Sequence, residues 1–191
     1  MSGRQAKVLS DQQIEDLLAY TSTTRNPERN RVIVLLSIKA GLRAGEIAKL
    51  TWDMVLDPTG EVGTLIELRN HAAKKMGGRL IPLNADLRVA LSTWRTLSEG
   101  VGAVLRSERS GHMTPVSIVN WFATAYRTIG VDGCSSHSGR RTFITRAARV
   151  VHQAGASLRD VQLLAGHRSI QTTQRYIDGD TDAQRKLVSL I

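Results

Sequence analysis

The sequence predicts a single compact domain that is mainly α-helical with one small antiparallel β-sheet, an α+β fold. Helix-capping residues recur along the chain, and each is followed by apolar side chains three or four positions apart. Only one stretch has β-compatible residues on both sides of a glycine pair. The chain has 191 residues and is 41% hydrophobic, which suits one domain with a buried core.

Three helices are expected before residue 51. The segment Ser10–Gln13 is typical of a capping box and precedes apolar residues at helical spacing, so it predicts the first helix. The pair Asn26–Pro27 indicates a second helix start, and the apolar pattern behind it continues toward Gly41. A short third helix is expected just after Leu42.

The next segment predicts a β-hairpin. Residues 64–68 and 79–83 are β-compatible runs, and the turn between them, residues 74–78, is basic and contains two glycines. The chain then returns to helix, with start signals at Asn84, Thr114, His137 and Ser157 and a short last helix over residues 170–177. A polar break at 178–180 precedes an amphipathic tail over residues 183–191.

The charge balance indicates the class of partner. Lysine and arginine number 26 against 17 aspartate and glutamate, a net charge of +9, which indicates nucleic acid or an anionic membrane surface. Few aromatics and no basic amphipathic helix disfavour the membrane. No apolar run approaches the ~20 residues of a membrane span, and the first residues lack a signal-peptide core. A single cysteine excludes an internal disulfide, so we expect a cytoplasmic protein.

Two local patterns place cationic groups at helix starts. Glu46 follows Arg43 by three residues and can hold its guanidinium through a fork-to-fork contact, although a surface ion pair would have the same spacing. His137 and Arg140 lie on one helix face near the N-terminus, where backbone N–H groups favour an anion. The alternative there is a capping histidine beside solvated arginines.

A third pattern adds His167, after a glycine at a helix junction, and Tyr176, nine residues later. Each has an ordinary structural explanation, since buried tyrosines pack their rings and hydrogen-bond their hydroxyls. Together, however, two arginines, two histidines, a turn lysine and a tyrosine are the parts of a metal-free phosphoryl transfer. Fixed cations stabilise charge on the non-bridging oxygens, a lysine protonates the departing alkoxide, and a deprotonated phenol attacks.

The ordered set Arg43, Lys74, His137-x-x-Arg140, His167 and Tyr176 resembles the catalytic domain of the tyrosine recombinase (phage integrase) family. The similarity runs from about Ser10 to Tyr176. It implies an N-terminal extension over 1–9, a catalytic domain over 10–177, and a tail helix over 178–191 that docks on a neighbouring protomer or on its own domain. Arg141 stands where the family often has a second histidine, and Ile177–Asp178 replaces the common Thr-His pair.

The resemblance also implies the role of each residue. Arg43 and Arg140 would clamp the scissile phosphate, with Glu46 behind Arg43, and His167 would donate to a phosphate oxygen. His137 would assist proton transfer at Tyr176, whose attack forms a 3′-phosphotyrosyl bond. Lys74 would be the general acid, with Lys75 as the alternative. Residues expected to contact DNA phosphates are Arg69, Lys75, Arg79, Arg141 and Arg168.

The expected activity is site-specific cleavage and rejoining of DNA strands without cofactor, metal or ATP. One thiol and scattered imidazoles are a poor metal-ligand set, and no phosphate-binding glycine loop is present. The expected partner is double-stranded DNA, bound by a monomer that becomes a tetramer on two sites. Accessory proteins or a separate core-binding domain are further expected partners. Two alternatives remain at this point: a type IB topoisomerase-like relaxing enzyme and a catalytically inert DNA-binding relative.

Overall fold

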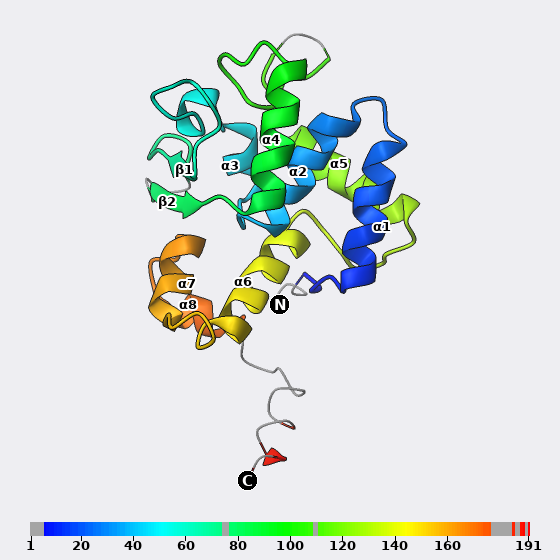
Figure 1. The fold of residues 1–191 in the computed structure, drawn as a ribbon. Coiled ribbons are helices and arrows are strands. Elements are labelled where there is room, and N and C mark those ends of the chain that lie inside the picture. The colour runs from blue at the N-terminus through cyan, green and yellow to red at the C-terminus, as the bar shows by residue number, and fades with distance from the viewer. Residues whose placement is uncertain (1–5, 74–76, 109–110, 177–184, 186–187, 190) are drawn as a thin grey trace.

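The computed structural model describes residues 6–73, 77–108, 111–176, 185, 188–189 and 191. In chain order its elements are α1 (Asp11–Ser22), α2 (Pro27–Ile38), α3 (Ala44–Ala48), the 3-10 helix η1 (Trp52–Met54), β1 (Leu65–Leu68), β2 (Arg79–Pro82), α4 (Ala85–Leu97), α5 (Pro115–Thr128), α6 (Ser138–Val150), α7 (Leu158–Ala165) and α8 (Ile170–Gln174) (Figure 1). The predicted fold class, mainly helical with a small antiparallel sheet, is confirmed.

The expected capping signals begin the helices where the sequence places them. Ser10 Oγ accepts the Gln13 N–H at 3.2 Å, and Gln13 Oε1 accepts the Ser10 N–H at 3.0 Å, which completes the capping box of α1. Asn84 and Thr114 likewise accept backbone N–H groups at the starts of α4 and α5. Local hydrogen bonding therefore fixes the start of each of these helices.

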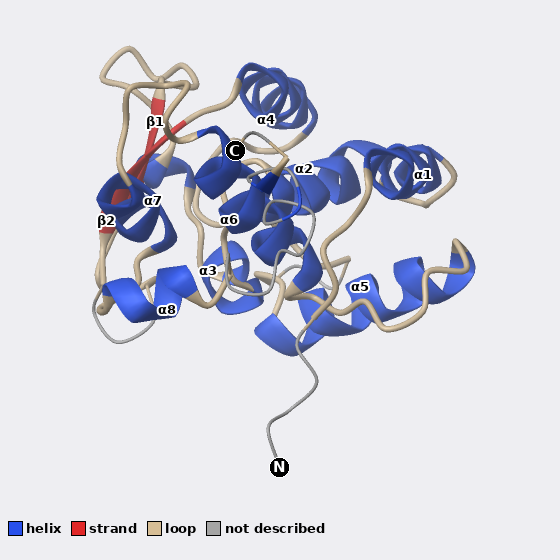
Figure 2. Ribbon diagram, turned by 90° about the horizontal axis from the view of Figure 1, so that it is seen from below, coloured by secondary structure: helices blue, strands red, loops and turns tan. Residues whose placement is uncertain are grey.

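The two strands pair antiparallel, with Leu65 opposite Pro82 and Leu68 opposite Arg79. Side chains alternate across a strand, so Ile66 and Ile81 face the core. The connection between the strands runs from residue 69 to residue 78, and part of it (74–76) lies outside the described residues. Figure 2 shows this small sheet at one side of the helical body, close to α7.

Helix α2 is the centre of the main core. Its residues from Val32 to Leu36 are at most 1% exposed, because α1, α4 and α6 surround it (Figures 1 and 2). The helix is therefore apolar on nearly every side rather than amphipathic. Val34 and Leu35 lie on different faces of it and are both buried.

A second, smaller core joins α6 to α7. It is built from Ile144, Ala148, Val151, Val161 and Ala165, and the ring of Tyr176 packs against it. In Figure 1 α6, α7 and α8 lie together at one end of the molecule. This packing anchors the C-terminal segment against α6.

The last helix differs from its prediction at one end. It was expected over residues 170–177, but α8 ends at Gln174, and Tyr176 follows it. The expected tail, 178–191, lies mostly outside the described residues. Within the part of the chain that is described, no helix is long and apolar enough to cross a membrane.

Candidate active site

Arg43 is the N-cap residue of α3, and Glu46 holds it there. The Arg43 backbone N–H donates to Glu46 Oε2 at 3.0 Å, and Arg43 Nη1 donates to Glu46 Oε1 at 2.7 Å. Glu46 itself is 1% exposed. The pair predicted from the spacing therefore exists and is partly buried, not a solvated surface contact. Only one guanidinium nitrogen of Arg43 takes part.

The two-bond fork on Glu46 comes from Arg79 instead. Its Nη1 and Nη2 donate to the two carboxylate oxygens at 3.1 and 3.0 Å, and its Nε donates to the Leu164 carbonyl at 2.7 Å. The expectation that Arg79 contacts DNA from the surface is corrected by this geometry. Arg79 shares the inward face of β2 with Ile81, and the Arg79 side chain is 7% exposed.

Arg140, on the first turn of α6, is 3% exposed and joins the loop after α2 to the end of α7. Its Nη1 donates to the Gly41 carbonyl at 2.5 Å, and its Nη2 donates to the Ala165 carbonyl at 2.6 Å. Burial and the nearby Arg43 charge lower the pKa of Arg140 to about 10, so it remains cationic at neutral pH. The guanidinium is thus fixed on both sides before any substrate binds.

His167 lies between Arg140 and α8. Its Nε2 is 3.0 Å from Arg140 Nη2, and its Nδ1 is 2.9 Å from Thr173 Oγ1. A guanidinium only donates, so Nε2 accepts and the ring proton lies on Nδ1, donated to Thr173. Burial and the charges of Arg140, Arg43 and Arg79 lower the pKa of His167 to about 4, which keeps the ring neutral. The ring must gain a proton or exchange tautomer before Nε2 can donate to a phosphate.

Tyr176 stacks on this imidazole. The ring centroids of His167 and Tyr176 are 5.3 Å apart at 23°, and the Arg141 guanidinium carbon lies 5.7 Å from the Tyr176 ring centroid. Thr145 Oγ1 also donates to the Tyr176 carbonyl at 3.3 Å. His167 and Arg141 therefore hold the Tyr176 ring, and Thr145 holds its backbone.

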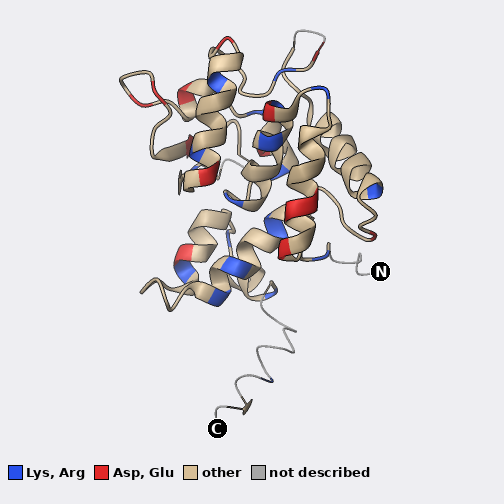
Figure 3. Ribbon diagram, turned by 45° about the vertical axis from the view of Figure 1, so that its right-hand side comes forward, with Lys and Arg blue, Asp and Glu red and all other residues tan. Residues whose placement is uncertain are grey.

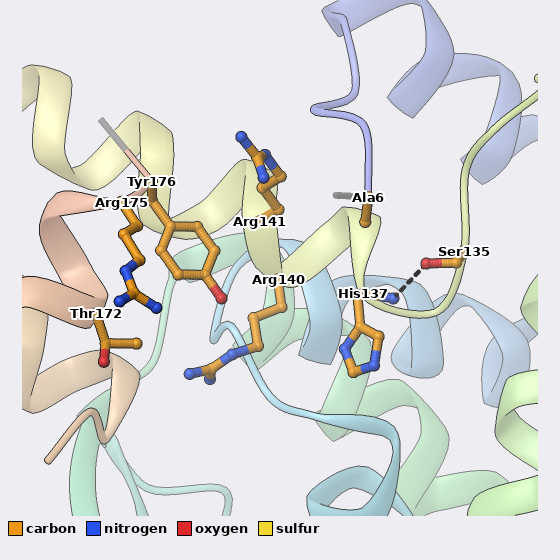
Figure 4. Close-up of a pocket in the computed structure, with 8 residues that line it drawn as sticks. All are labelled: Ala6, Ser135, His137, Arg140, Arg141, Thr172, Arg175 and Tyr176. Carbon is orange, nitrogen blue, oxygen red and sulfur yellow. Dashed lines mark hydrogen bonds between the residues drawn. The ribbon is translucent and has the colours of Figure 1, made fainter. Parts of the chain in front are cut away.

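A cavity of about 350 Å³ is lined by both Arg140 and Tyr176. In Figure 4 the Tyr176 hydroxyl points toward Arg140, and His137 lies on the far side of Arg140. The full lining is Ala6, Ser135, His137, Arg140, Arg141, Thr172, Arg175 and Tyr176. The tyrosine predicted as nucleophile and one of the two predicted phosphate-binding arginines thus share a cavity within one subunit.

His137 connects this cavity to a second one. It is the N-cap residue of α6, its backbone N–H donates to Ser135 Oγ at 3.3 Å, and its side chain is exposed. The second cavity, of about 360 Å³, is lined by His137, Arg43 and Glu46, and also by Ala72 and Ala73. Lys74 and Lys75 follow Ala73 in the chain, and both lie outside the described residues.

The other residues expected to contact DNA phosphates lie in different surroundings. Arg69 forms an ion pair with Asp53, and Arg168 is exposed beside His167. Arg141 lies over the Tyr176 ring. Basic residues are spread over several helices and loops rather than confined to one (Figure 3). Among the described residues, no group of three His, Cys, Asp or Glu side chains is arranged to hold a metal ion.

Sequence reasoning missed the contacts that two residues make in this site. Thr173 was given no role, although it is 0% exposed and its Oγ1 lies 2.9 Å from His167 Nδ1. Arg79 was expected at a DNA phosphate, and its contacts with Glu46 and Leu164 were not predicted. The strand period places Arg79 on the same face as buried Ile81, which is the signal that could have revealed its burial. No comparable signal places Thr173 against His167, because that contact depends on how α8 packs.

The Glu46 carboxylate gives a pH-dependent prediction. Burial alone would raise its pKa, but the hydrogen bonds and charges of Arg79 and Arg43 outweigh burial and lower the pKa from 4.5 to about 2. The ionised carboxylate therefore stabilises the fold above about pH 4.5, and this contribution, roughly 3 kcal/mol, is lost as pH falls toward about 2. Urea unfolding of wild type and Glu46→Gln from about pH 6 down to about pH 3 measures it. We expect the stability difference to shrink with falling pH; a constant difference would contradict the assignment.

Comparison with known proteins gives a consistent result. The family model described as "Phage integrase family" matches residues 7–182. Tyrosine recombinase XerC of Erythrobacter litoralis is 29% identical over 97% of this chain and 58% of its own length. Tyrosine recombinase XerC of Corynebacterium glutamicum is 28% identical over 89% of this chain and 54% of its own length. The chain thus spans little more than half the length of these relatives.

Solved structures agree on the fold. XerA recombinase superposes with a TM-score of 0.78 at 21% identity, covering 98% of this chain and 65% of that one. A post-cleavage complex of XerH site-specific recombinase bound to palindromic difH substrate superposes with a TM-score of 0.74 at 20% identity, covering 98% of this chain and 54% of that one. At this level of identity, the likeness is one of fold.

Proposed function

The chain belongs to the phage integrase family, and we propose that it is the catalytic part of a site-specific DNA recombinase. It would cleave and rejoin strands through a 3′-phosphotyrosyl intermediate. One observation carries the proposal: the Tyr176 hydroxyl points toward Arg140 in the cavity that both residues line (Figure 4). The Tyr176 ring also stacks on His167. A merely structural tyrosine would not need its hydroxyl beside a buried guanidinium.

In the proposed reaction, Arg43 and Arg140 bind the non-bridging oxygens of the scissile phosphate and stabilise the charge that builds on them. The Tyr176 oxygen gives up its proton, with His137 as the proposed acceptor, and attacks the phosphorus. The bond from phosphorus to the 5′-oxygen breaks, and Lys74 protonates that oxygen. Rejoining is the reverse, with the 5′-hydroxyl of a partner strand attacking the phosphotyrosine.

His167 would enter the reaction only after the substrate arrives. With Nε2 occupied by Arg140, the neutral ring cannot donate there. Burial and three nearby cations keep the ring neutral. A bound phosphodiester brings a negative charge, which favours the imidazolium and counters those cations. Thr173 would keep accepting the Nδ1 proton throughout, so the ring stays oriented while Nε2 becomes a donor.

The excess positive charge supports double-stranded DNA as the partner, through release of condensed counterions. Arg69, Arg141, Arg168 and Lys75 stay proposed phosphate contacts. We further propose a monomer in solution and a tetramer on two sites, with the tail over 178–191 docking in trans or in cis. The XerC relatives are longer, so a core-binding domain or accessory proteins are proposed to complete the grip on DNA. A cytoplasmic location stays a prediction.

The function is tested by incubating the protein with a mixed pool of nicked duplexes in two parallel reactions, one without and one with a chelator. We expect DNA that stays attached after boiling in detergent, and sequencing it gives the cleavage site. Absence of any adduct would assign the chain to inert DNA-binding relatives. Adduct formation accompanied by relaxation of supercoiled plasmid, without strand exchange between sites, would indicate a topoisomerase-like enzyme. Loss of the adduct with chelator would contradict a metal-free mechanism.

The choice between Lys74 and Lys75 gives a separate prediction. A 5′-sulfur leaving group departs without a proton, so it removes the need for a general acid. We expect Lys74→Ala to cleave the normal substrate slowly and the sulfur substrate at close to the wild-type rate. Lys75→Ala is the matched control and is expected to show no selective rescue. Rescue of both variants, or of neither, would contradict the assignment of Lys74.

A further inference from the structure

We infer that Arg79 is a positioning residue that couples Glu46, and through it Arg43, to the turn that presents His167. The inference deepens the proposed function and rests on it, because Arg43 and His167 act there on the same phosphate. Arg79 itself touches neither the phosphate nor the nucleophile in this arrangement. It acts by fixing the relative position of two groups that do.

The first half of the coupling is the shared carboxylate. Glu46 Oε1 accepts from Arg43 Nη1 at 2.7 Å and from Arg79 Nη1 at 3.1 Å, while Oε2 accepts from the Arg43 backbone N–H and from Arg79 Nη2. The Arg79 and Glu46 side chains are 7% and 2% exposed. A buried, two-bond guanidinium–carboxylate pair has a narrow geometry, so Arg79 sets the plane in which Glu46 receives Arg43.

The second half is the C-terminal end of α7. Arg79 Nε donates to the Leu164 carbonyl at 2.7 Å, and Arg140 Nη2 donates to the next carbonyl, that of Ala165, at 2.6 Å. Carbonyls at a helix C-terminus lack intrahelical partners and attract cations. Two guanidinium groups from β2 and α6 therefore share the end of α7, only two or three residues before His167.

Gly166 shows how closely Arg79 approaches this turn. Gly166 has a φ of +62° and ends α7 in the left-handed conformation. A Cβ built on it would lie 2.9 Å from Arg79 Nη1 and 3.2 Å from Arg79 Cζ. The guanidinium thus packs directly on the backbone that leads into His167, and both the turn conformation and this contact call for glycine.

The same contacts argue against Arg79 as a DNA contact. A phosphate contact needs an exposed guanidinium edge, yet Nε, Nη1 and Nη2 of Arg79 each already donate to a protein acceptor. If Arg79 released Glu46, the carboxylate would lose two of its hydrogen bonds and would keep the ion pair with Arg43. Glu46 is 1% exposed, so water could not replace the lost partner. Buried carboxylates are costly without full pairing, so the pair is expected to persist when DNA binds.

The test compares Arg79→Met with Arg25→Met, a matched control whose arginine forms an exposed ion pair with Glu108. Two quantities are measured: the single-turnover rate of adduct formation on a nicked substrate, and duplex affinity across a range of salt concentrations. For Arg79→Met we expect the rate to fall about 100-fold, because small misplacements of reacting groups have effects of that size. Affinity and its salt slope are expected to match wild type, and Arg25→Met is expected to keep the wild-type rate.

A second variant separates positioning from folding. Glu46→Gln/Arg79→Met removes both buried charges, so no unpaired carboxylate is left to destabilise the domain. It is expected to fold and still to cleave slowly. Wild-type cleavage by Arg79→Met or by this double variant would overturn the inference. So would a loss of affinity in Arg79→Met with a salt slope smaller by about 1, which is the signature of a lost phosphate contact.

One measurement tests the coupling without any cleavage. Side-chain Nε–H NMR relaxation of Arg43 reports whether its guanidinium is ordered. We expect order in wild type and Arg25→Met, and clear mobility in Arg79→Met at unchanged fold. An ordered Arg43 guanidinium in Arg79→Met would overturn the inference. If wild type forms no adduct but Arg43 is still ordered in wild type and mobile in Arg79→Met, the proposed function alone would be overturned.

Discussion

Tyr176→Phe is expected to abolish the covalent adduct with a nicked substrate while duplex affinity stays within about twofold of wild type. The phenylalanine ring can keep the stack on His167 and the contact with Arg141, so the change removes only the attacking oxygen. The assay is denaturing electrophoresis of labelled DNA, with gel shift at matched concentrations for binding.

The other tyrosines supply the control for that result. The chain has three, and Tyr126 is 2% exposed, with burial raising the pKa of its phenol well above the ordinary value. Tyr20 lies in α1 and packs near Trp121. Tyr20→Phe is therefore expected to form adduct at the wild-type rate. An adduct that persists in Tyr176→Phe would show that another group is the nucleophile.

Arg140→Lys is expected to lower the cleavage rate by about 10³-fold or more, with only a small loss of affinity. Lysine keeps the charge but loses the planar guanidinium that contacts Gly41, Ala165 and His167. Loss of a single preorganised donor at the reacting oxygen lowers the rate of the chemical step by about 10²–10³-fold. The loss is expected in the rate, because the stabilised charge develops in the transition state.

Arg140 also links the loop after α2 to the end of α7, so its effect on folding is measured separately. Thermal unfolding of Arg140→Lys is compared with that of Arg149→Lys, an exposed arginine on the same helix. Arg149→Lys is expected to cleave at the wild-type rate. If Arg140→Lys cleaves within about tenfold of wild type while folded, the clamp assigned to Arg140 is wrong.

Much of the fold could be predicted from the sequence because its signals are local. A capping box such as Ser10–Gln13, or a cap followed by proline as at Thr114–Pro115, closes its own hydrogen bonds within one helical turn. Residue spacing alone also placed Glu46 against Arg43. In these cases the partners are three or fewer residues apart, so tertiary packing has little influence on the contact.

The remaining features depend on contacts between distant parts of the chain. Arg79 and Leu164 are 85 residues apart, and nothing in either segment alone indicates their hydrogen bond. The neutral state of His167 similarly results from burial and from three arginines that only the tertiary fold brings together. Net charge predicted a polyanionic partner, but it could not separate a surface arginine such as Arg69 from a buried one such as Arg79.

The most direct test of the account is the identity of the residue that carries DNA. The protein is reacted with a nicked duplex in the presence of chelator, digested with nuclease and protease, and the modified peptide is sequenced by mass spectrometry. We expect a nucleotide remnant on the oxygen of Tyr176. A remnant on any other residue, or none in protein shown to bind the duplex, would contradict it.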